Sequence, residues 1–287
     1  MALSDYDDIA IDLWTIAICR GSSPFALQGE ARPVLSASDV DDVRAIFLAD
    51  PFMIPADGGW HMFFEVLNRS NRLGEIGHAV SADGTSWTYD RIVLREPFHL
   101  SYPCVFEWNG HYWMVPETLG ANAIRLYRGD PFPGRWTFVT DLVAGYAADP
   151  TVFRYSGRWW MFACLTPHQH RTLALYYADA LTGPWHAHPR NPIVENDPSI
   201  GRPGGRVLVD GDRLFRFAQD SVPVYGRQVR AFEILELTAD RYREREMDES
   251  PVLTASGAGW NAVGMHHLDA HRLGPASWIA CVDGRRE

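Results

Sequence analysis

The chain has no surplus of positive charge and no long apolar run. Its 287 residues include 26 Lys or Arg against 36 Asp or Glu, a net charge of −10. Such a balance argues against nucleic acid or an anionic membrane as a partner. No apolar stretch approaches the roughly 20 residues that a membrane-spanning helix needs. Residues 1–8 are acidic and lack the basic start of a secretory signal peptide. We therefore expect a cytoplasmic protein without a membrane span.

Motifs for metals and cofactors are also missing. The four cysteines are widely separated and none belongs to a C-x-x-C pair, so a zinc site is not expected. Each cysteine lies within a run that reads as a strand, which favours buried free thiols. The glycine-rich segment 201–205 lacks the helix that a phosphate-binding loop requires. We expect no redox cofactor. A structural cation near the axis stays open, although no set of metal ligands is recognisable.

The chain does contain one sequence pattern that is repeated about five times. Each copy contains an apolar strand, a glycine turn and an aromatic-rich second strand, and the first four copies start at a proline. The first four copies begin at Pro51, Pro103, Pro150 and Pro203, and a fainter fifth copy begins near residue 264. A period of roughly 50 residues with several strands per unit is typical of a β-propeller.

The last copy has room for only two strands, and the N-terminal segment can supply the others. Residues 14–25 resemble residues 124–132, which form the third strand of the second copy. Pairing the first strands with the last would close the ring and protect its sheet edges. We predict an all-β, five-bladed β-propeller forming a single domain over residues 1–287. A β-sandwich or a two-domain all-β protein is the alternative.

The repeat boundaries assign each segment to a blade. The expected blades 1 to 4 are residues 46–97, 98–145, 146–198 and 199–255. Residues 256–287 would form the inner part of blade 5, which residues 1–45 would complete.

The start of each innermost strand of a propeller lies near the central pocket. The residues in this place are Asp50, Tyr102, Asp149, Arg202 and, in the fifth copy, His266 or His267. An Asp-Pro pair can simply start a strand, but its repetition at equivalent positions favours a functional role. Strand alternation would point one of the two histidines inward and the other outward.

Two glutamates end second strands inside otherwise apolar runs. Glu65 and Glu117 hold these places, and Gln219 holds the comparable place in the fourth copy. A carboxylate in such a setting is either paired with an arginine, such as Arg202 or Arg230, or has a raised pKa. His168 and His170 lie in a polar loop and read as a chance pair. Aromatic residues make up 13% of the chain, and those not used in packing would suit stacking on sugar faces.

Six stretches of the chain carry a resemblance to a known family. They are residues 60–67 with 74–77, 96–103, 106–110, 216–220, 230–234 and 264–267. Through them nearly the whole chain resembles the N-terminal domain of plant glucosamine inositolphosphorylceramide transferases and its bacterial stand-alone or formyltransferase-fused counterparts. The resemblance implies the propeller fold. It implies function less directly, because glycosyl transfer in those proteins is attributed to a separate domain.

The two Asp-Pro pairs resemble the inner-strand aspartates of glycoside hydrolase family 43 and its five-bladed relatives, which include levansucrase and invertase-type enzymes. The resemblance implies that Asp50 is the general base and that Asp149 orients the substrate and tunes the acid. The family's general-acid Glu is missing here, because the corresponding segment reads Ile-Gly-Arg-Pro and ends in Arg202-Pro203. An inverting hydrolase needs an acid about 6.5–9.5 Å from the base, and Glu117 or Glu65 would have to supply it.

Three functions remain open. The first is a glycosidase or transglycosidase with Asp50, Asp149 and Glu117 as catalytic residues. Its substrate would be an acidic or phosphorylated sugar if Arg202 binds an anion bidentately. The second is a non-catalytic module that binds a sugar or glycolipid headgroup beside a partner transferase, with Arg202 neutralising Asp50 or Asp149. The third is a non-hydrolytic biosynthetic enzyme, since propellers host many chemistries.

A small molecule or oligosaccharide is the expected ligand in each case. The candidate substrate-binding residues are Glu65, Tyr102, Arg202, Gln219, Arg230 and His266.

Overall fold

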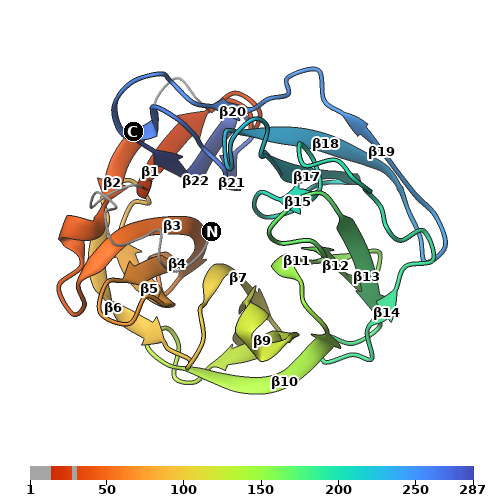
Figure 1. Ribbon diagram of the computed structural model, residues 1–287, viewed down its shortest axis with the longest axis horizontal. Coiled ribbons are helices and arrows are strands. Elements are labelled where there is room, and N and C mark those ends of the chain that lie inside the picture. The colour runs from red at the N-terminus through yellow and green to blue at the C-terminus, as the bar shows by residue number, and fades with distance from the viewer. Residues whose placement is uncertain (1–13, 28–30) are drawn as a thin grey trace.

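A ring of five antiparallel sheets surrounds a central axis (Figure 1). The computed structural model describes residues 14–27 and 31–287. In this part of the chain the only helical pieces are three short 3-10 turns: η3 (Ala37–Asp39), η4 (Leu119–Ala121) and η5 (Gly259–Asn261). The prediction of an all-β, five-bladed propeller is therefore confirmed. The acidic segment 1–8 and part of the N-terminal region assigned to blade 5 lie outside the described residues.

Four blades are built from consecutive strands, with the first strand of each nearest the axis (Figure 1). Blade 1 consists of β3 (Ala45–Ala56), β4 (Gly59–Asn68), β5 (Gly74–Ser81) and β6 (Thr88–Leu94). Blade 2 consists of β7 (Ser101–Trp108), β8 (His111–Glu117), β9 (Ala123–Gly129) and β10 (Trp136–Ala144). Blade 3 consists of β11 (Ala148–Tyr155), β12 (Arg158–Cys164), β13 (Leu173–Ala178) and β14 (His186–Ala187). Blade 4 consists of β15 (Arg202–Pro203), β16 (Leu208–Asp210), β17 (Arg213–Asp220), β18 (Gln228–Leu237), β19 (Tyr242–Glu246) and β20 (Leu253–Thr254).

The fifth blade joins the two ends of the chain. Its strands are β21 (Leu268–Gly274), β22 (Ser277–Arg285), β1 (Trp14–Gly21) and β2 (Arg32–Leu35). The strand β1 pairs with β22 along its whole length, with Trp14 opposite Arg285 and Gly21 opposite Trp278. This pairing confirms that N-terminal strands close the ring. It leaves no unpaired edge where the two ends meet.

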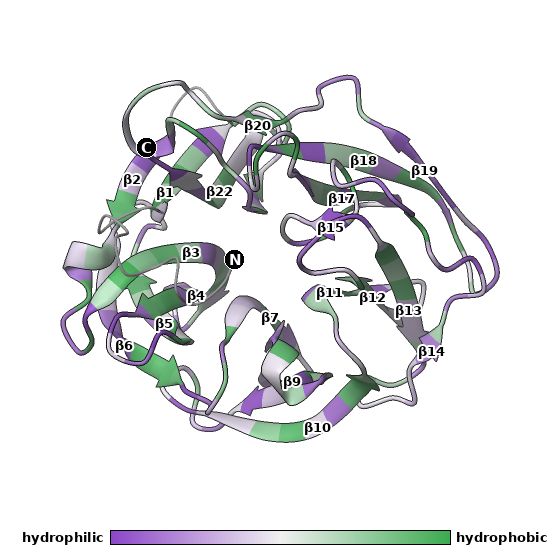
Figure 2. Ribbon diagram, in the orientation of Figure 1, coloured by the Kyte–Doolittle hydropathy of each residue, from purple (hydrophilic) through white to green (hydrophobic). Residues whose placement is uncertain are grey.

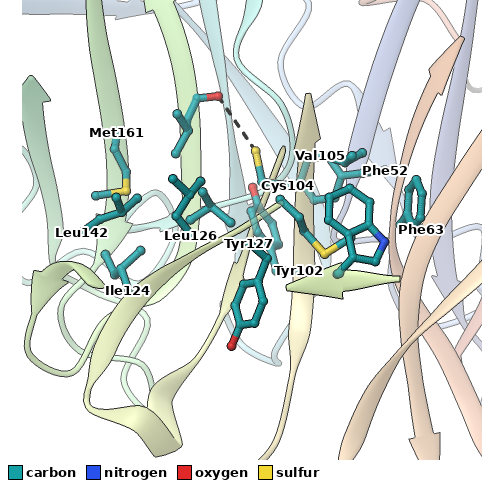
Figure 3. Packing of buried hydrophobic residues seen from close by; sticks show 14 of the residues in the cluster. Phe52, Phe63, Tyr102, Cys104, Val105, Ile124, Leu126, Tyr127, Leu142 and Met161 are labelled. Carbon is teal, nitrogen blue, oxygen red and sulfur yellow. Dashed lines mark hydrogen bonds between the residues drawn. The ribbon is translucent and has the colours of Figure 1, made fainter. Parts of the chain in front are cut away.

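Apolar side chains fill the spaces between neighbouring blades. The largest cluster joins blades 1, 2 and 3 and includes Phe63, Leu126 and Met161 (Figure 3). Alternate residues of β1 pack in opposite directions: Ile16 lies in the cluster with blade 1, and Ala17 lies in the cluster with blade 4. The outer strand β19 of blade 4 is hydrophilic (Figure 2). The four cysteines are buried free thiols, as predicted.

Three inner strands share a bulge at the equivalent place of the repeat, near the start of β7 and β11 and in the middle of β3. Asp50, Tyr102 and Asp149 have φ values of 54°, 47° and 51°, in the left-handed region that residues other than glycine seldom adopt. At each place the pairing between the first and second strands skips this residue and the following proline. A bulge bends a strand and changes the direction of its side chains. The repeated proline and the residue before it therefore form the bulge that bends each of these strands near the axis.

Arg206 ties four blades together across the axis. It follows β15 in blade 4, and its Nε donates to Asp269 Oδ1 on β21 of blade 5 at 2.6 Å. Its other nitrogens donate to the carbonyl oxygens of Val105 in blade 2 (2.9 Å) and Met53 in blade 1 (3.4 Å). An ion pair between a partly buried arginine and a fully buried aspartate therefore links the inner strands at the axis.

Tyr102 forms a second link near the axis. Its hydroxyl lies 2.7 Å from Thr151 Oγ1 in blade 3 and accepts the Gly205 N–H of blade 4 at 2.8 Å. The side chain is fully buried and lies in the cluster with Phe52 and Cys104 (Figure 3). Both its ring and its hydroxyl are therefore used in joining blades.

No helix among residues 14–27 and 31–287 has the length and apolar character to cross a membrane. The cytoplasmic location stays a prediction.

Candidate active site

A cavity of about 400 Å³ lies at the axis, and all five blades contribute to its lining. Among the residues expected at the site, those that line it are Asp50, Glu65, Glu117, Arg202 and His266. The structure adds several that the sequence analysis did not select: Trp14, His99, His168, His170, Tyr225 and Arg285. The bulges bring Asp50 and Asp149 to this region from strands that are far apart in the sequence.

Arg202 and Asp149 form the electrostatic centre of the site. Arg202 Nε donates to Asp149 Oδ2, and Nη2 donates to Oδ1 at 3.1 Å. Gln219 Nε2 also donates to Asp149 Oδ2, at 2.7 Å. Burial alone would raise the pKa of Asp149, but Arg202 outweighs burial and holds this pKa below its usual value. Asp149 is therefore an ionised carboxylate.

All five N–H groups of Arg202 have acceptors within the protein. Besides the contacts to Asp149, Nη2 lies 3.4 Å from Glu117 Oε2. Nη1 donates to the Pro167 carbonyl oxygen at 3.2 Å and lies 3.1 Å from His170 Nδ1. A guanidinium has five N–H donors, so none remains for a bidentate contact with a ligand. The anion of an acidic sugar would have to displace some of these partners, and the role of Arg202 in binding an anion stays a prediction.

His170 is part of this network, which corrects its interpretation as one of a chance pair. Burial, followed by the charge of Arg202, lowers the pKa of His170 to about 4. The neutral ring can therefore accept a hydrogen bond from Arg202 at neutral pH. His170 also packs against Tyr225, with ring centroids 4.9 Å apart. His168 lines the cavity and lies 3.2 Å from the Tyr146 hydroxyl.

Glu117 is the carboxyl group best suited to donate a proton. It is 6% exposed and lies at the end of β8, where it meets Asp149 and Arg202. Burial and the charge of Asp149 raise the pKa of Glu117 to about 8, although Arg202 opposes the shift. Glu117 is thus mostly neutral at pH 7, next to an ionised aspartate.

Asp50 lies across the site in a group with two histidines. Its backbone N–H donates to Asp283 Oδ2 at 2.9 Å. Its Oδ1 lies 3.8 Å from His266 Nε2 and 3.8 Å from His267 Nδ1. Burial, and then the charges of Asp149, Asp283 and Glu65, raise the pKa of Asp50 well above its ordinary value.

The expectation that His266 and His267 point in opposite directions is wrong, because both approach Asp50. The two residues precede β21 and are not part of a strand. Asp283 Oδ1 accepts both of their backbone N–H groups at 3.1 Å and lies 2.8 Å from His266 Nδ1. Asp283 thus holds the turn and orients the His266 ring, although nothing in the sequence pattern singled it out.

Glu65 has its own partner on the cavity wall. His99 Nε2 lies 3.1 Å from Glu65 Oε1, and His99 Nδ1 accepts the Gly74 N–H at 2.9 Å. The hydrogen of a neutral His99 is therefore on Nε2, facing Glu65. Burial alone would lower the pKa of His99, but Glu65 and Glu117 outweigh burial and raise it. His99 lies within residues 96–103, one of the stretches that carry the family resemblance. That resemblance is the feature of the sequence that could have pointed to His99 as a site residue.

Three residues expected to bind substrate are not part of the cavity lining. Tyr102 is in the core, as described above, and is not part of the cavity lining. Arg230 lies on β18 and forms an ion pair with Glu246, and its Nη1 donates to Ser199 Oγ at 3.0 Å. Neither side chain has a contact with the cavity that would support the expected role. Gln219 lies behind the lining and acts on Asp149.

Aromatic rings complete one side of the cavity. Trp14 stacks on His266 with ring centroids 4.0 Å apart. Tyr225 lies beside the same histidine, and the Arg202 guanidinium sits 5.3 Å from the Tyr225 ring centroid. The cavity therefore combines several carboxyl groups with an aromatic wall, and pockets of this kind hold small molecules.

Comparison of the chain with solved structures shows which known folds it shares. The catalytic domain of the Coprinopsis cinerea GH62 α-L-arabinofuranosidase superposes with a TM-score of 0.60 at 14% identity, covering 94% of this chain and 97% of that one. CoXyl43, a GH43 β-xylosidase/α-arabinofuranosidase from a compost microbial metagenome, gives 0.57 at 12% identity, covering 75% and 79%. These likenesses show the fold of propeller glycoside hydrolases.

Sequence comparison defines the family. Residues 10–285 match the family described as glucosamine inositolphosphorylceramide transferase 1, N-terminal, and the chain belongs to this family. Glucosamine inositolphosphorylceramide transferase 1 of Oryza sativa subsp. japonica is 34% identical over 297 residues. That match covers 95% of this chain and 40% of the rice protein, so the chain spans well under half the length of this relative. The resemblance stated from the sequence is confirmed.

Proposed function

We propose that the axial cavity binds a carbohydrate and acts on its glycosidic bond, with Glu117 as proton donor and Asp50 as proton acceptor. The observation that carries the proposal is the state of Glu117, a carboxyl group that lines the cavity and remains neutral up to a pH of about 8. A general acid must hold its proton at the working pH, and carboxyl groups in glycosidases reach this state through burial and neighbouring charge.

In this proposal Glu117 takes the place of the general acid that the related hydrolases have and this chain lacks. Asp149 and Arg202 set the pKa of Glu117. The ionised Asp149 raises the pKa of Glu117, and Arg202 keeps Asp149 ionised. Glu117 would protonate the departing glycosidic oxygen. Asp50 in its ionised form would accept a proton from the attacking hydroxyl or water. Because the donors of Arg202 are all engaged, we propose that the sugar bound next to it is uncharged.

A second candidate function is a binding module that works beside a transferase. The observation in its favour is the internal pairing of Arg202 with Asp149, which stabilises a fixed site without any ligand. The relatives are named as transferases, and this chain corresponds to 40% of the rice protein. In such a module the cavity would hold a sugar or glycolipid headgroup without changing it.

A turnover screen separates the two functions. Neutral oligosaccharides and inositol-containing glycosides would be incubated with the wild type, Glu117→Gln and Asp50→Asn, with the exposed Glu249→Gln as control, and products would be detected by mass spectrometry. We expect turnover to fall by about 10²–10⁴-fold in Glu117→Gln and to be unchanged in the control. Full turnover in Glu117→Gln would reject its role as acid. A ligand that stabilises the wild type against heat but is never converted would favour the binding module.

A further inference from the structure

Arg285 is an arginine of the cavity wall whose side chain has no partner among the described residues. It is the last residue of β22 and lines the axial cavity. Its Nε is buried and forms no hydrogen bond, and no carboxyl group of residues 14–27 or 31–287 forms an ion pair with its guanidinium. Buried polar groups are nearly always paired in folded proteins. For a guanidinium at a cavity, the natural partner is a group of a bound ligand.

The charged neighbours of Arg285 in the lining already have partners of their own. Arg202 donates to both carboxylate oxygens of Asp149. Glu65 Oε1 lies 3.1 Å from His99 Nε2. A guanidinium has five N–H donors. Among the described residues of the lining, Arg285 is therefore the arginine whose side-chain donors remain available to a ligand.

The neighbouring strand fixes the direction of Arg285. Trp14 on β1 lies directly opposite Arg285 in the antiparallel pair, and opposite residues of such a pair project from the same face of the sheet. Trp14 faces the cavity, where it stacks on His266 with ring centroids 4.0 Å apart. On the other side of Arg285, its N–H donates to the Gly264 carbonyl oxygen and its carbonyl oxygen accepts the Val263 N–H, both at 2.9 Å. The base of the side chain is thus held on both sides, which lowers the cost of ordering it around a ligand.

The carboxyl groups of the cavity do not prevent an anion from binding at this wall. His266, which Trp14 covers, has its Nε2 3.8 Å from Asp50 Oδ1. The pKa of Asp50 is raised well above its ordinary value, and that of Glu117 is raised to about 8. Both groups therefore carry less negative charge at neutral pH than ordinary carboxyl groups, and they repel an anion less.

We propose that Arg285 binds an oxyanion of the cavity ligand, a phosphate or carboxylate group carried by a sugar, through a bidentate contact. The planar guanidinium presents parallel N–H groups that match the oxygen atoms of either group. The inference rests on the proposed function and deepens it, because it names the substrate class as a sugar with an anionic substituent. The sugar ring next to Arg202 stays uncharged, and the anion lies at the blade 5 wall.

The sequence analysis assigned an anion to Arg202 instead. There the anion would have to displace internal acceptors such as the Pro167 carbonyl oxygen, whereas Arg285 has no side-chain partner to displace among the described residues. Arg285 lies at the end of β22, outside the repeated motif. Its place beside Trp14 exists only because β1 and β22 complete the last blade.

The test measures anion binding and needs no turnover. The full chain would be titrated with inorganic phosphate and, separately, with acetate by isothermal titration calorimetry at constant ionic strength. We expect a saturable site in the wild type and binding weakened by at least about tenfold in Arg285→Gln, which loses the charge and the paired donors. Tighter binding of phosphate would identify a phosphorylated sugar as the ligand, and tighter binding of acetate would identify a sugar acid.

The matched control is Arg286→Gln, which removes the same charge from the next residue. Arg286 is exposed and is not among the residues that line the cavity, so anion binding should be unchanged. Arg285→Lys keeps the charge but loses the planar pair of donors, and its affinity should lie between those of the wild type and Arg285→Gln. Circular dichroism would verify that each variant is folded, and Arg285→Lys would replace Arg285→Gln in the comparison if the latter is not.

Equal anion affinity in the wild type and folded Arg285→Gln would overturn the proposal, because the anion would then bind elsewhere. Absence of a saturable site for both anions in the wild type would overturn it as well. The two proposals can fail separately. Turnover of neutral glycosides without an anion site would reject this inference alone, whereas an anion site that depends on Arg285 in a protein that converts no glycoside would reject the catalytic role alone.

Discussion

Replacing Glu117 by glutamine should make the stability of this protein less sensitive to pH. The pKa of Glu117 is about 8 in the folded protein and 4.5 in its ordinary state. Between these two values the folded chain holds a proton that the unfolded chain has released. Stability is therefore greatest at low pH for this group and decreases as the pH rises toward 8.

The size of the effect follows from linkage. Each pKa unit corresponds to about 1.4 kcal/mol, so between pH 5.5 and 7.5 Glu117 would reduce the free energy of unfolding by about 3 kcal/mol. Glutamine has nearly the same shape and does not titrate. Its amide oxygen can still accept the Asp149 N–H and the Arg202 contact that Glu117 Oε2 accepts. The loss between the two pH values should therefore be smaller in Glu117→Gln by about this amount.

Urea unfolding at pH 5.5 and 7.5, followed by tryptophan fluorescence, would measure the difference. Glu249→Gln, which removes an exposed glutamate, is the control and should keep the wild-type dependence on pH. Asp50 titrates in both proteins, so its contribution cancels in the comparison. If wild type and Glu117→Gln lose the same stability between the two pH values, the pKa of Glu117 is not raised. Its role as a proton donor would then be refuted as well.

Three further changes test the fold and the charge network. Arg202→Met leaves Asp149 and Glu117 buried without their cation, and urea unfolding should show a loss of about 3–5 kcal/mol; wild-type stability would refute the pairing. Gly205→Ala places a Cβ 1.9 Å from the Leu268 carbonyl oxygen at φ +127°. We expect little folded protein by circular dichroism, and a normal Tm would contradict the close packing. Deleting residues 1–21 removes β1 from the middle of blade 5 and leaves the edge of β22 unpaired. We expect the shortened protein to aggregate, as measured by light scattering. A soluble monomer would show that the ring does not need this strand.

The fold could be predicted because its signals are local and repeated. Each copy contains a proline, an apolar strand, a glycine turn and an aromatic strand, and the similarity of segment 14–25 to segment 124–132 placed the N-terminal strands. The strand positions also brought Asp50, Glu65 and Glu117 into the candidate site. Glu117 ends β8, whereas Asp50 and Glu65 lie inside β3 and β4, and all three line the cavity.

The predictions that failed concern the direction in which a side chain points, not the place of its residue in the fold. Tyr102 has the same left-handed backbone as Asp50 and Asp149, but its side chain lies in the core. His266 and His267 both approach Asp50, because a turn held by Asp283 replaces the expected strand alternation. Bulges and turns change where side chains point, and simple alternation cannot describe them.

The sequence by itself determined the class of fold, the closure of the ring and most of the carboxyl groups at the axis, because these depend on short-range patterns and their repetition. Only the tertiary structure decided the chemical state of those groups. Whether Glu117 holds a proton and whether Arg202 has a free N–H depend on burial and on distances to Asp149 and His170. Such residues are far apart along the chain, and electrostatic interactions depend on their separation in space.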